Sequence, residues 1–389
     1  MVKASASTST STISERRPPW QDLQPELLGL VLQRMPSHAD RVRLRAVCRL
    51  WRAAAHLQPP LPPLLPWILQ PDGTLLSLPD GAVHRIPVPD DVCRRMSTGG
   101  MLFLVHSNYT CSLLNPFSRE TTGAQHIHPA CLSPQPIRIP WDYNVRKVVM
   151  MPDHIITVKR AYYPETQCNN MVCIRRRRST ATVDIRWVPS MPSVSRAMAD
   201  VALFQDKLYA LVGTPAGTIH LYVLDIIDDK HVALQRVLPT PVDDDDQGYT
   251  GIVHRYLVAS GDRLLMVKER RDRSPKLPSL FKQPIFDVSE AAGLCSGGGR
   301  WRKVDTLTGR ALFLSQGCSE SLPAGGPYVG AREDCIYFLC ERHQCDHSWS
   351  LCSGMYNVRQ GTVSPLPFKA MVAEEGPGTT CWLFPPTDI

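Results

Sequence analysis

The 389-residue sequence lacks the short motifs that identify the common classes of enzyme. It has no G-x-x-x-x-G-K-[ST] phosphate-binding loop, no G-x-S-x-G nucleophile elbow and no H-E-x-x-H metal-binding pair. A G-x-G-x-x-G dinucleotide motif opening a helix is also missing. The sequence therefore nominates no catalytic residue and no cofactor.

Long apolar runs are missing as well. The most hydrophobic candidate, residues 59–69, is interrupted by five prolines, and no secretory apolar region precedes the cysteines. The 13 cysteines are odd in number and follow no regular framework, which indicates reduced thiols rather than disulfides. We therefore expect a protein without membrane contact that works in the cytoplasm, the nucleus or both.

Acidic residues are scarce at the start of the chain, where residues 1–17 are rich in Ser, Thr and Ala and contain only Glu15. This composition also occurs in organelle transit peptides. Because the segment is short, we interpret it as a disordered leader.

The net charge of +7 and the pI near 8.8 do not identify a partner, because much of the excess lies in local runs. Arg175–Arg178 are either a nuclear-import signal or phosphate contact, or simply an exposed loop. Asp243–Asp246 read as a solvated loop, since consecutive carboxylates cannot wrap a calcium ion. Without a recognition helix or interleaved aromatics, nucleic acid is not an expected partner.

One group of residues has the composition of a zinc site: Cys335, Cys340, His343, Cys345, His347 and Cys352. Its spacing lacks paired C-x-x-C knuckles. Cys335 and Cys340 also flank an apolar strand, where small buried thiols are ordinary core residues. We therefore predict no metal there, nor at the weaker group of His126, His128 and Cys131.

Helical periodicity is confined to residues 20–55. The first helix is expected between Pro25, a favoured first helical residue, and Pro36, which closes the run. Ser37 can cap a second helix, and the apolar residues after it form no single stripe. A second and a third helix should therefore meet near residues 45–46. Three such helices bury too little apolar surface to be stable alone, so the unit needs a partner.

These residues resemble the F-box, the module by which substrate receptors bind the Skp adaptor of cullin–RING ubiquitin ligases. The match rests on Leu23 and on residues 25–28, and on an R-x-V-C-x-x-W-R signature made by Arg45, Val47, Cys48, Trp51 and Arg52. The resemblance implies the following adaptor-binding residues: Leu23, Pro25, Leu27, Leu28, Val47, Cys48 and Trp51. The family's usual Leu-Pro is here Leu23-Gln24, with the proline one place later. The alternative is an ordinary helical hairpin packed on its own domain.

From Trp67 onward the pattern is that of β-strands, and no long helical stretch follows Ala55. Hairpins are expected at turns such as Asp206-Lys207 and Gly261-Asp262, each followed by a further strand. This unit recurs at intervals of roughly 50 to 70 residues, as propeller blades do. We predict a mainly β protein with a β-propeller of six or seven blades, and a β-sandwich is the alternative.

The later half is similar to the kelch-like propeller of the plant KIB-type family, in which an F-box precedes the propeller. The matching motifs are 301–305, 309–314, Gly317-Cys318 and 337–339. The expected organisation is a leader (1–17), an F-box module (18–57), a proline-rich linker (58–66) and a propeller (67–386).

The two resemblances together imply a non-catalytic substrate receptor of an SCF-type ubiquitin ligase. Its helices would bind the Skp adaptor, and through it cullin, while its propeller captures an unknown protein substrate. Two alternatives stay open: a propeller scaffold without ligase function, and a propeller enzyme or sugar-binding protein.

Overall fold

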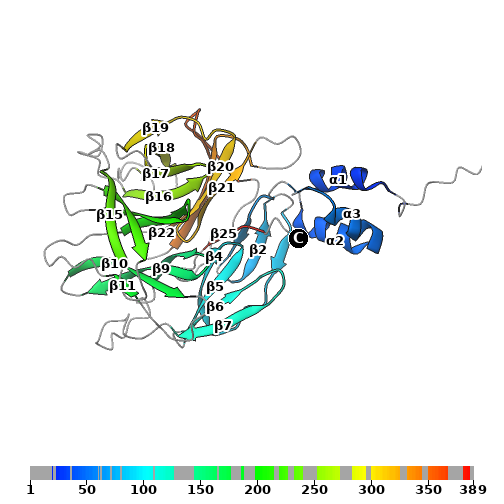
Figure 1. The fold of residues 1–389 in the computed structure, drawn as a ribbon, viewed down its shortest axis with the longest axis horizontal. Helices are drawn as coiled ribbons and strands as arrows, with labels where there is room; N and C mark the ends of the chain where they lie inside the picture. The colour runs from blue at the N-terminus through cyan, green and yellow to red at the C-terminus, as the bar shows by residue number, and fades with distance from the viewer. Residues whose placement is uncertain are drawn as a thin grey trace, which may run out of the picture.

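The computed structural model describes residues 20, 23–35, 37–59, 61, 64–70, 72–78, 81–107, 110–126, 144–163, 166–176, 185–187, 198–213, 219–226, 232–239, 252–271, 283–294, 299–324, 331–343, 349–366 and 380–385. Within these ranges, three short helices are followed by β-strands alone (Figure 1). None of the described helices has both the length and the apolar character that crossing a membrane requires. The fold is therefore mainly β, as the sequence predicts.

The three helices begin and end where local signals in the sequence place them. They are α1 (Pro25–Arg34), α2 (His38–Ala46) and α3 (Arg49–His56). The Oγ atom of Ser37 accepts a hydrogen bond from the Asp40 amide at 3.4 Å, which caps α2. In the same way, Cys48 Sγ accepts from the Trp51 amide at the start of α3. The predicted junction of the second and third helices near 45–46 is confirmed.

The described strands form six sheets. Five are four-stranded and antiparallel: β25 (Cys381–Leu383), β1 (Trp67–Leu69), β2 (Thr74–Ser77), β3 (Val83–Arg85); β4 (Val92–Thr98), β5 (Met101–His106), β6 (Thr110–Leu114), β7 (Thr121–His126); β8 (Asn144–Met150), β9 (His154–Tyr163), β10 (Thr166–Arg176), β11 (Ile185–Trp187); β12 (Met198–Phe204), β13 (Lys207–Gly213), β14 (Ile219–Ile226), β15 (Val232–Pro239); and β16 (Ile252–Ser260), β17 (Arg263–Arg271), β18 (Ile285–Ala292), β19 (Arg300–Val304). The sixth has five strands in the order β21 (Ser319–Pro323), β20 (Arg310–Ser315), β22 (Cys335–His343), β23 (Trp349–Asn357), β24 (Thr362–Ser364).

The sheets are arranged in a ring (Figure 1). Contacts run from β25 to β4, β8, β12, β16 and β21 in turn, and β20 contacts β25 to close the circle. A β-sandwich has no such closed order, so the architecture is a β-propeller. Of the six described sheets in the ring, five have the regular four-stranded antiparallel form, so the expected six or seven blades are corrected to five regular blades and one irregular sheet. The sixth sheet differs from this form in two ways. Its strands β20 and β22 pair in parallel, and β21 pairs with the other edge of β20 as a fifth strand.

The ring is closed by strands from the two ends of the β region. β25 pairs antiparallel with β1, with Trp382 opposite Ile68. Trp382 is fully buried, and its Nε1 atom donates to the Leu314 carbonyl of β20 at 3.0 Å. One indole therefore joins the closing sheet to the irregular sheet beside it.

Most predicted hairpins form, with one shift of register. β16 and β17 are joined by Gly261 and Asp262, as expected, with Gly261 at φ +65°. The hairpin between β12 and β13 turns instead at Gln205 and Asp206, because Phe204 pairs with Lys207. Both turn residues have positive φ, at 49° and 58°, which matches the handedness of a tight antiparallel hairpin.

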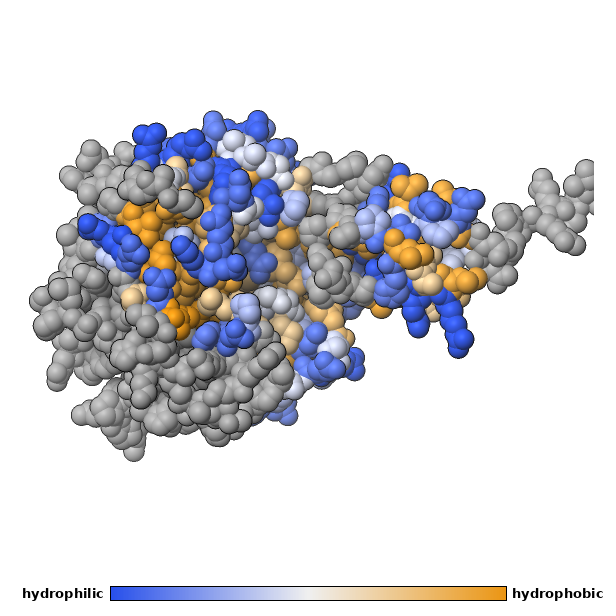
Figure 2. Space-filling view, in the orientation of Figure 1, coloured by the Kyte–Doolittle hydropathy of each residue, from blue (hydrophilic) through white to orange (hydrophobic). Residues whose placement is uncertain are grey.

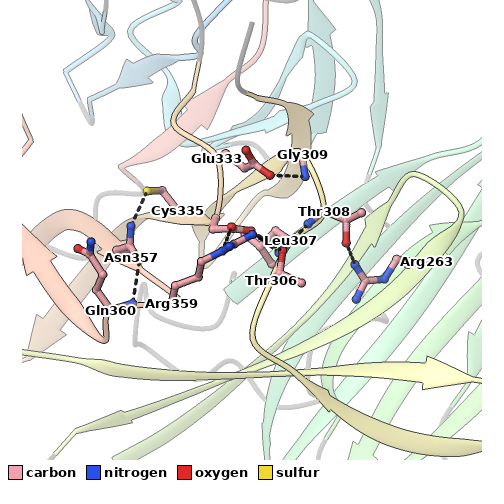
Figure 3. A network of polar contacts seen from close by, with 11 residues as sticks. Arg263, Thr306, Leu307, Thr308, Gly309, Glu333, Cys335, Asn357, Arg359 and Gln360 are labelled. Atoms are coloured by element: carbon pink, nitrogen blue, oxygen red, sulfur yellow. Dashed lines mark hydrogen bonds and ion pairs between the residues drawn. The ribbon is translucent and has the colours of Figure 1, made fainter.

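A polar network fixes the connections of the irregular sheet (Figure 3). Its centre is the Asp334 carboxylate, which is 95% buried and accepts from the Leu307 amide at 2.6 Å and the Thr306 hydroxyl at 2.9 Å. Arg359 donates to the other carboxylate oxygen from the end of β23. Asp334 has φ +56°, a conformation that Asp tolerates better than most residues. The network ties three loops of this sheet together.

The helices contact the propeller through His38. His38, at the start of α2, lies 5.8 Å from the Trp67 ring of β1 and 4.8 Å from the Phe117 ring, centroid to centroid. The Asn115 side chain holds the Phe117 turn by accepting from its amide at 2.9 Å. The helical module is therefore attached to the first two sheets of the ring.

Candidate functional site

The helical module has a small core of its own. Leu28 and Leu32 of α1 pack with Leu44 of α2 and with Ala54 and Ala55 of α3. Gly29 allows close approach of the end of α3, since a Cβ atom there would lie 1.9 Å from Gln58 Oε1. Gln58 in turn donates to the Pro25 carbonyl at 2.8 Å. The module thus holds its shape with one face of α1 turned inward.

The module also exposes large apolar side chains, which together we call the outer face: Leu27, Leu30, Val31, Val42, Val47 and Leu50, each between 40% and 62% exposed. On α1 these residues are spaced at i, i+3 and i+4, so they form one stripe. Figure 2 shows apolar areas on this module, between hydrophilic ones. Exposed apolar side chains grouped in this way are typical of a protein-binding surface.

The seven sequence-predicted binding residues do not all reach this surface. Leu27 and Val47 are on the outer face, Pro25 is exposed, and Leu23, Cys48 and Trp51 are half-buried. Leu28 is only 1% exposed and belongs to the core of the module, so it lies behind the outer face rather than on it, and its role in adaptor binding stays a prediction. The reason is geometric: adjacent residues on a helix lie about 100° apart, so Leu27 and Leu28 cannot face the same way.

Sequence reasoning missed four members of the outer face: Leu30, Val31, Val42 and Leu50. Their spacing relative to Leu27 was readable, but the apolar residues of α1 occupy both sides of the helix. Periodicity alone did not indicate which stripe faces inward. The signal that would have found them is Gly29, which marks the side of α1 that α3 approaches.

Trp51, on α3, is hydrogen-bonded to Trp20, which lies before the first helix. Its indole Nε1 donates to the Trp20 carbonyl at 3.0 Å, and Trp20 itself is 77% exposed. Trp51 also packs on the core of the module. It therefore joins the core of the module to Trp20 and is itself half-buried.

Basic side chains surround the outer face. Arg43, Arg49 and Arg52 are exposed, and within the described part of the chain only Arg43 of these three has an acidic partner, with its guanidinium 2.8 Å from Asp40. Arg41 is different, because it is buried and its Nε donates to the Met35 carbonyl at 3.1 Å. Burial lowers the pKa of Arg41 to about 10. The exposed arginines favour approach of an acidic partner.

The remaining sequence candidates form no second site in the described part of the chain. Cys335 and Cys340 belong to two different core clusters, on opposite sides of β22, so they cannot share a metal ion. Cys345, His347, His128, Cys131 and Asp243–Asp246 lie outside the described residues, as do Arg177 and Arg178. Among the described residues, no three His, Cys, Asp or Glu side chains are grouped as metal ligands would be.

Comparison with protein families gives two matches. The model of the KIB1-4 β-propeller family matches residues 75–359, which is well over half of the chain. The model of the F-box domain matches residues 20–61, the region that contains all three helices. None of the curated proteins matches this chain.

Solved structures match this chain only at low similarity. The β-propeller domain of Cps50 (Swd1) from Myceliophteria thermophila is 11% identical, covers 78% of this chain and 83% of its own, and has a TM-score of 0.38. The endo-arabinase from Bacteroides thetaiotaomicron is 10% identical, covers 77% of this chain and 96% of its own, and has a TM-score of 0.35. Likenesses at this level carry no inference about function.

Proposed function

Because this chain belongs to the KIB1-4 β-propeller family and carries an F-box domain at its N-terminal end, we propose that it is a substrate receptor of an SCF-type ubiquitin ligase. In this proposal the outer face binds a Skp-type adaptor, which connects the chain to cullin. The propeller binds the protein that is to be modified.

The mechanism is proximity rather than catalysis by this chain. A receptor that holds a target lysine near a charged conjugating enzyme raises the effective concentration of the two reacting groups. The receptor itself makes and breaks no bond. An F-box followed by a propeller is the architecture typical of such non-catalytic adaptors.

The observation that supports this proposal best is the outer face itself. A module with its own core has little reason to expose Leu27, Val31 and Leu50 unless another protein covers them. Apolar anchors at the centre of an interface typically cost about 2 kcal/mol or more when truncated. A charge placed there should cost more, because it would be buried without a partner.

The test is capture of a recombinant Skp-type adaptor by variants of the full chain. Val31→Asp and Leu50→Asp, separately, should reduce capture at least tenfold, whereas the module stays folded because both side chains point outward. Ile285→Asp is the matched control: Ile285 is 54% exposed on β18, far from the helices in sequence, and its variant should bind normally. Undiminished capture by both helix variants, with normal helical circular dichroism, would rule out the outer face as the adaptor site.

A second candidate is a propeller scaffold that has no ligase function. Gln24 favours it, since this residue replaces the usual proline and makes no side-chain cap at the start of α1. Co-purification of cullin with the tagged chain distinguishes the two, because a scaffold would recover its client without cullin. A propeller enzyme or sugar-binding protein is the third candidate, and saturable binding of a sugar would favour it.

We further propose that the chain acts in the cytoplasm, the nucleus or both, where SCF ligases act. The plant source and the kelch-like character of the blades stay predictions from the sequence resemblance.

A further inference from the structure

The propeller contains a cavity of about 280 Å³ among the innermost strands of its sheets. Its walls come from β4, β8, β12, β16 and β21, which follow one another around the ring. The polar side chains that line it include Ser97 on β4, Lys147 on β8 and Glu320 on β21. This volume accommodates a small molecule or one long side chain.

Among the residues that the structure describes, none forms a hydrogen bond with the Ser97 hydroxyl. Ser97 is 1% exposed, and its Oγ atom is buried in the wall of the cavity. Buried hydroxyl groups are nearly always paired, because leaving them unpaired is unfavourable. Because Ser97 belongs to the cavity lining, a group bound in the cavity would supply this partner.

The charges around the cavity do not balance. Lys147 Nζ lies 2.8 and 2.9 Å from the two carboxylate oxygens of Asp200, so this pair is neutral overall. Glu320 has no such partner among the described residues, and its one hydrogen bond is a weak one from Cys318 Sγ at 3.8 Å. The cavity wall thus holds one carboxylate that forms no ion pair with a described residue.

We propose that this cavity binds a small organic cation, either a protonated alkylamine or an alkylguanidinium group. Its N–H groups would donate to the Glu320 carboxylate and to Ser97 Oγ, which satisfies the unpaired charge and the unpaired hydroxyl together. The group belongs to a free metabolite or to a Lys or Arg side chain of another protein. This inference is independent of the outer face and of adaptor binding.

The proposal predicts a specific dependence on pH. Burial raises the pKa of Glu320 to about 7, while the nearby Lys147 ammonium acts in the opposite direction. Asp200, Cys318 and Arg310 are the other titratable groups on the elements packed around it. A cation favours the ionised carboxylate, so binding should strengthen as the pH rises through 7. An alkylamine stays protonated across this range, since its pKa is about 10.

The experiment is isothermal titration calorimetry of the full chain with n-butylamine, n-butylguanidine and the neutral analogue n-butanol. With a carboxyl pKa near 7, affinity for the two cations should be roughly tenfold higher at pH 8 than at pH 6. Glu320→Gln should weaken binding at least tenfold and abolish the pH dependence. Glu120→Gln, which changes an exposed carboxylate outside the cavity, is the matched control and should bind normally.

Three results would overturn the proposal: no binding of either cation, equal binding of n-butanol, or unchanged binding by Glu320→Gln. If Glu320→Gln does not fold, Ser97→Ala replaces it and should weaken binding several-fold. N-acetylarginine N-methylamide distinguishes the two sources. Tighter binding of this capped arginine than of n-butylguanidine indicates a protein side chain, and the reverse order indicates a free metabolite.

Discussion

The buried ion pair between Lys147 and Asp200 should be a principal link between blades. Lys147 lies on β8 and Asp200 on β12, and both side chains are less than 10% exposed. The Asp200 carboxylate also accepts hydrogen bonds from the Val201 amide at 2.8 Å and from the Leu257 amide of β16 at 2.7 Å. One carboxylate therefore joins the innermost strands of three consecutive sheets.

The cost of removing Asp200 follows from these contacts. Asp200→Ala leaves the Lys147 charge buried without a counterion, a loss of about 3–5 kcal/mol, and also leaves the Val201 and Leu257 amides unpaired at about 1–3 kcal/mol each. These losses are not additive, because water entering the space left by the Asp200 carboxylate would form hydrogen bonds with the Lys147 ammonium and with both amides. We expect a decrease of about 5 kcal/mol in the free energy of unfolding.

A double-mutant cycle measures the coupling directly. Lys147→Met should cost about 3 kcal/mol, since Asp200 keeps its two amide donors. Combining Lys147→Met with Asp200→Asn should cost at least about 2 kcal/mol less than the sum of the two single changes. Urea unfolding followed by tryptophan fluorescence, in both directions, gives the free energies.

A surface ion pair of the same length is the control. Arg43 and Asp40 are also 2.8 Å apart, but their side chains are 76% and 46% exposed. Arg43→Met should change the free energy of unfolding by less than about 0.5 kcal/mol, because water already screens this pair. Additivity of the Lys147 and Asp200 changes to within about 0.5 kcal/mol would refute the idea that the pair couples the blades.

Two further predictions concern His38 and Asp334. Burial is the main cause that lowers the pKa of His38 from 6.5 to about 4, so the stability it contributes is present above pH 6.5 and is lost as the pH falls toward 4. His38→Leu should flatten this loss in urea midpoints measured between pH 4.5 and 7, and an unchanged slope would contradict it. Asp334→Ala should lower the free energy of unfolding by about 3 kcal/mol, whereas Arg359→Ala, at a side chain 61% exposed, should cost less than about 1 kcal/mol. Equal losses in the two variants would refute the central role of the Asp334 carboxylate.

Local signals in the sequence predicted local structure well. Pro25 and Ser37 act within one helical turn of themselves, so the starts of α1 and α2 could be read directly. The turn predicted at Asp206-Lys207 lies one residue earlier in the structure, at Gln205-Asp206. The pairing of Phe204 with Lys207 fixes this register, and the turn residues themselves do not indicate it. The parallel pairing of β20 with β22 had no local signal, since the two strands are not neighbours in the sequence and β21 lies between them.

The candidate sites were less predictable, because they combine residues that are distant in the sequence. Leu27 and Leu28 are chemically alike, and only the packing of α3 decides that one is exposed and the other buried. Ser97 and Glu320 carry no motif, and the closing of the ring brings them to one cavity. Their significance lies in what they lack, a partner and a counterion, and a sequence does not record missing contacts.

The attachment of the helical module to the ring affects how the proposed adaptor-binding and substrate-binding surfaces are placed relative to each other. His38 contacts Trp67, and Trp67 is the first residue of β1, which pairs with the closing strand β25. The same sheet therefore closes the propeller and orients the outer face relative to it. Because a receptor works by proximity, the angle between its adaptor-binding surface and its substrate-binding surface determines which lysines can be reached. If this chain is the receptor proposed above, loosening β25 should disturb the placement of the substrate even where the outer face still binds its adaptor, because β25 pairs with the strand that His38 contacts.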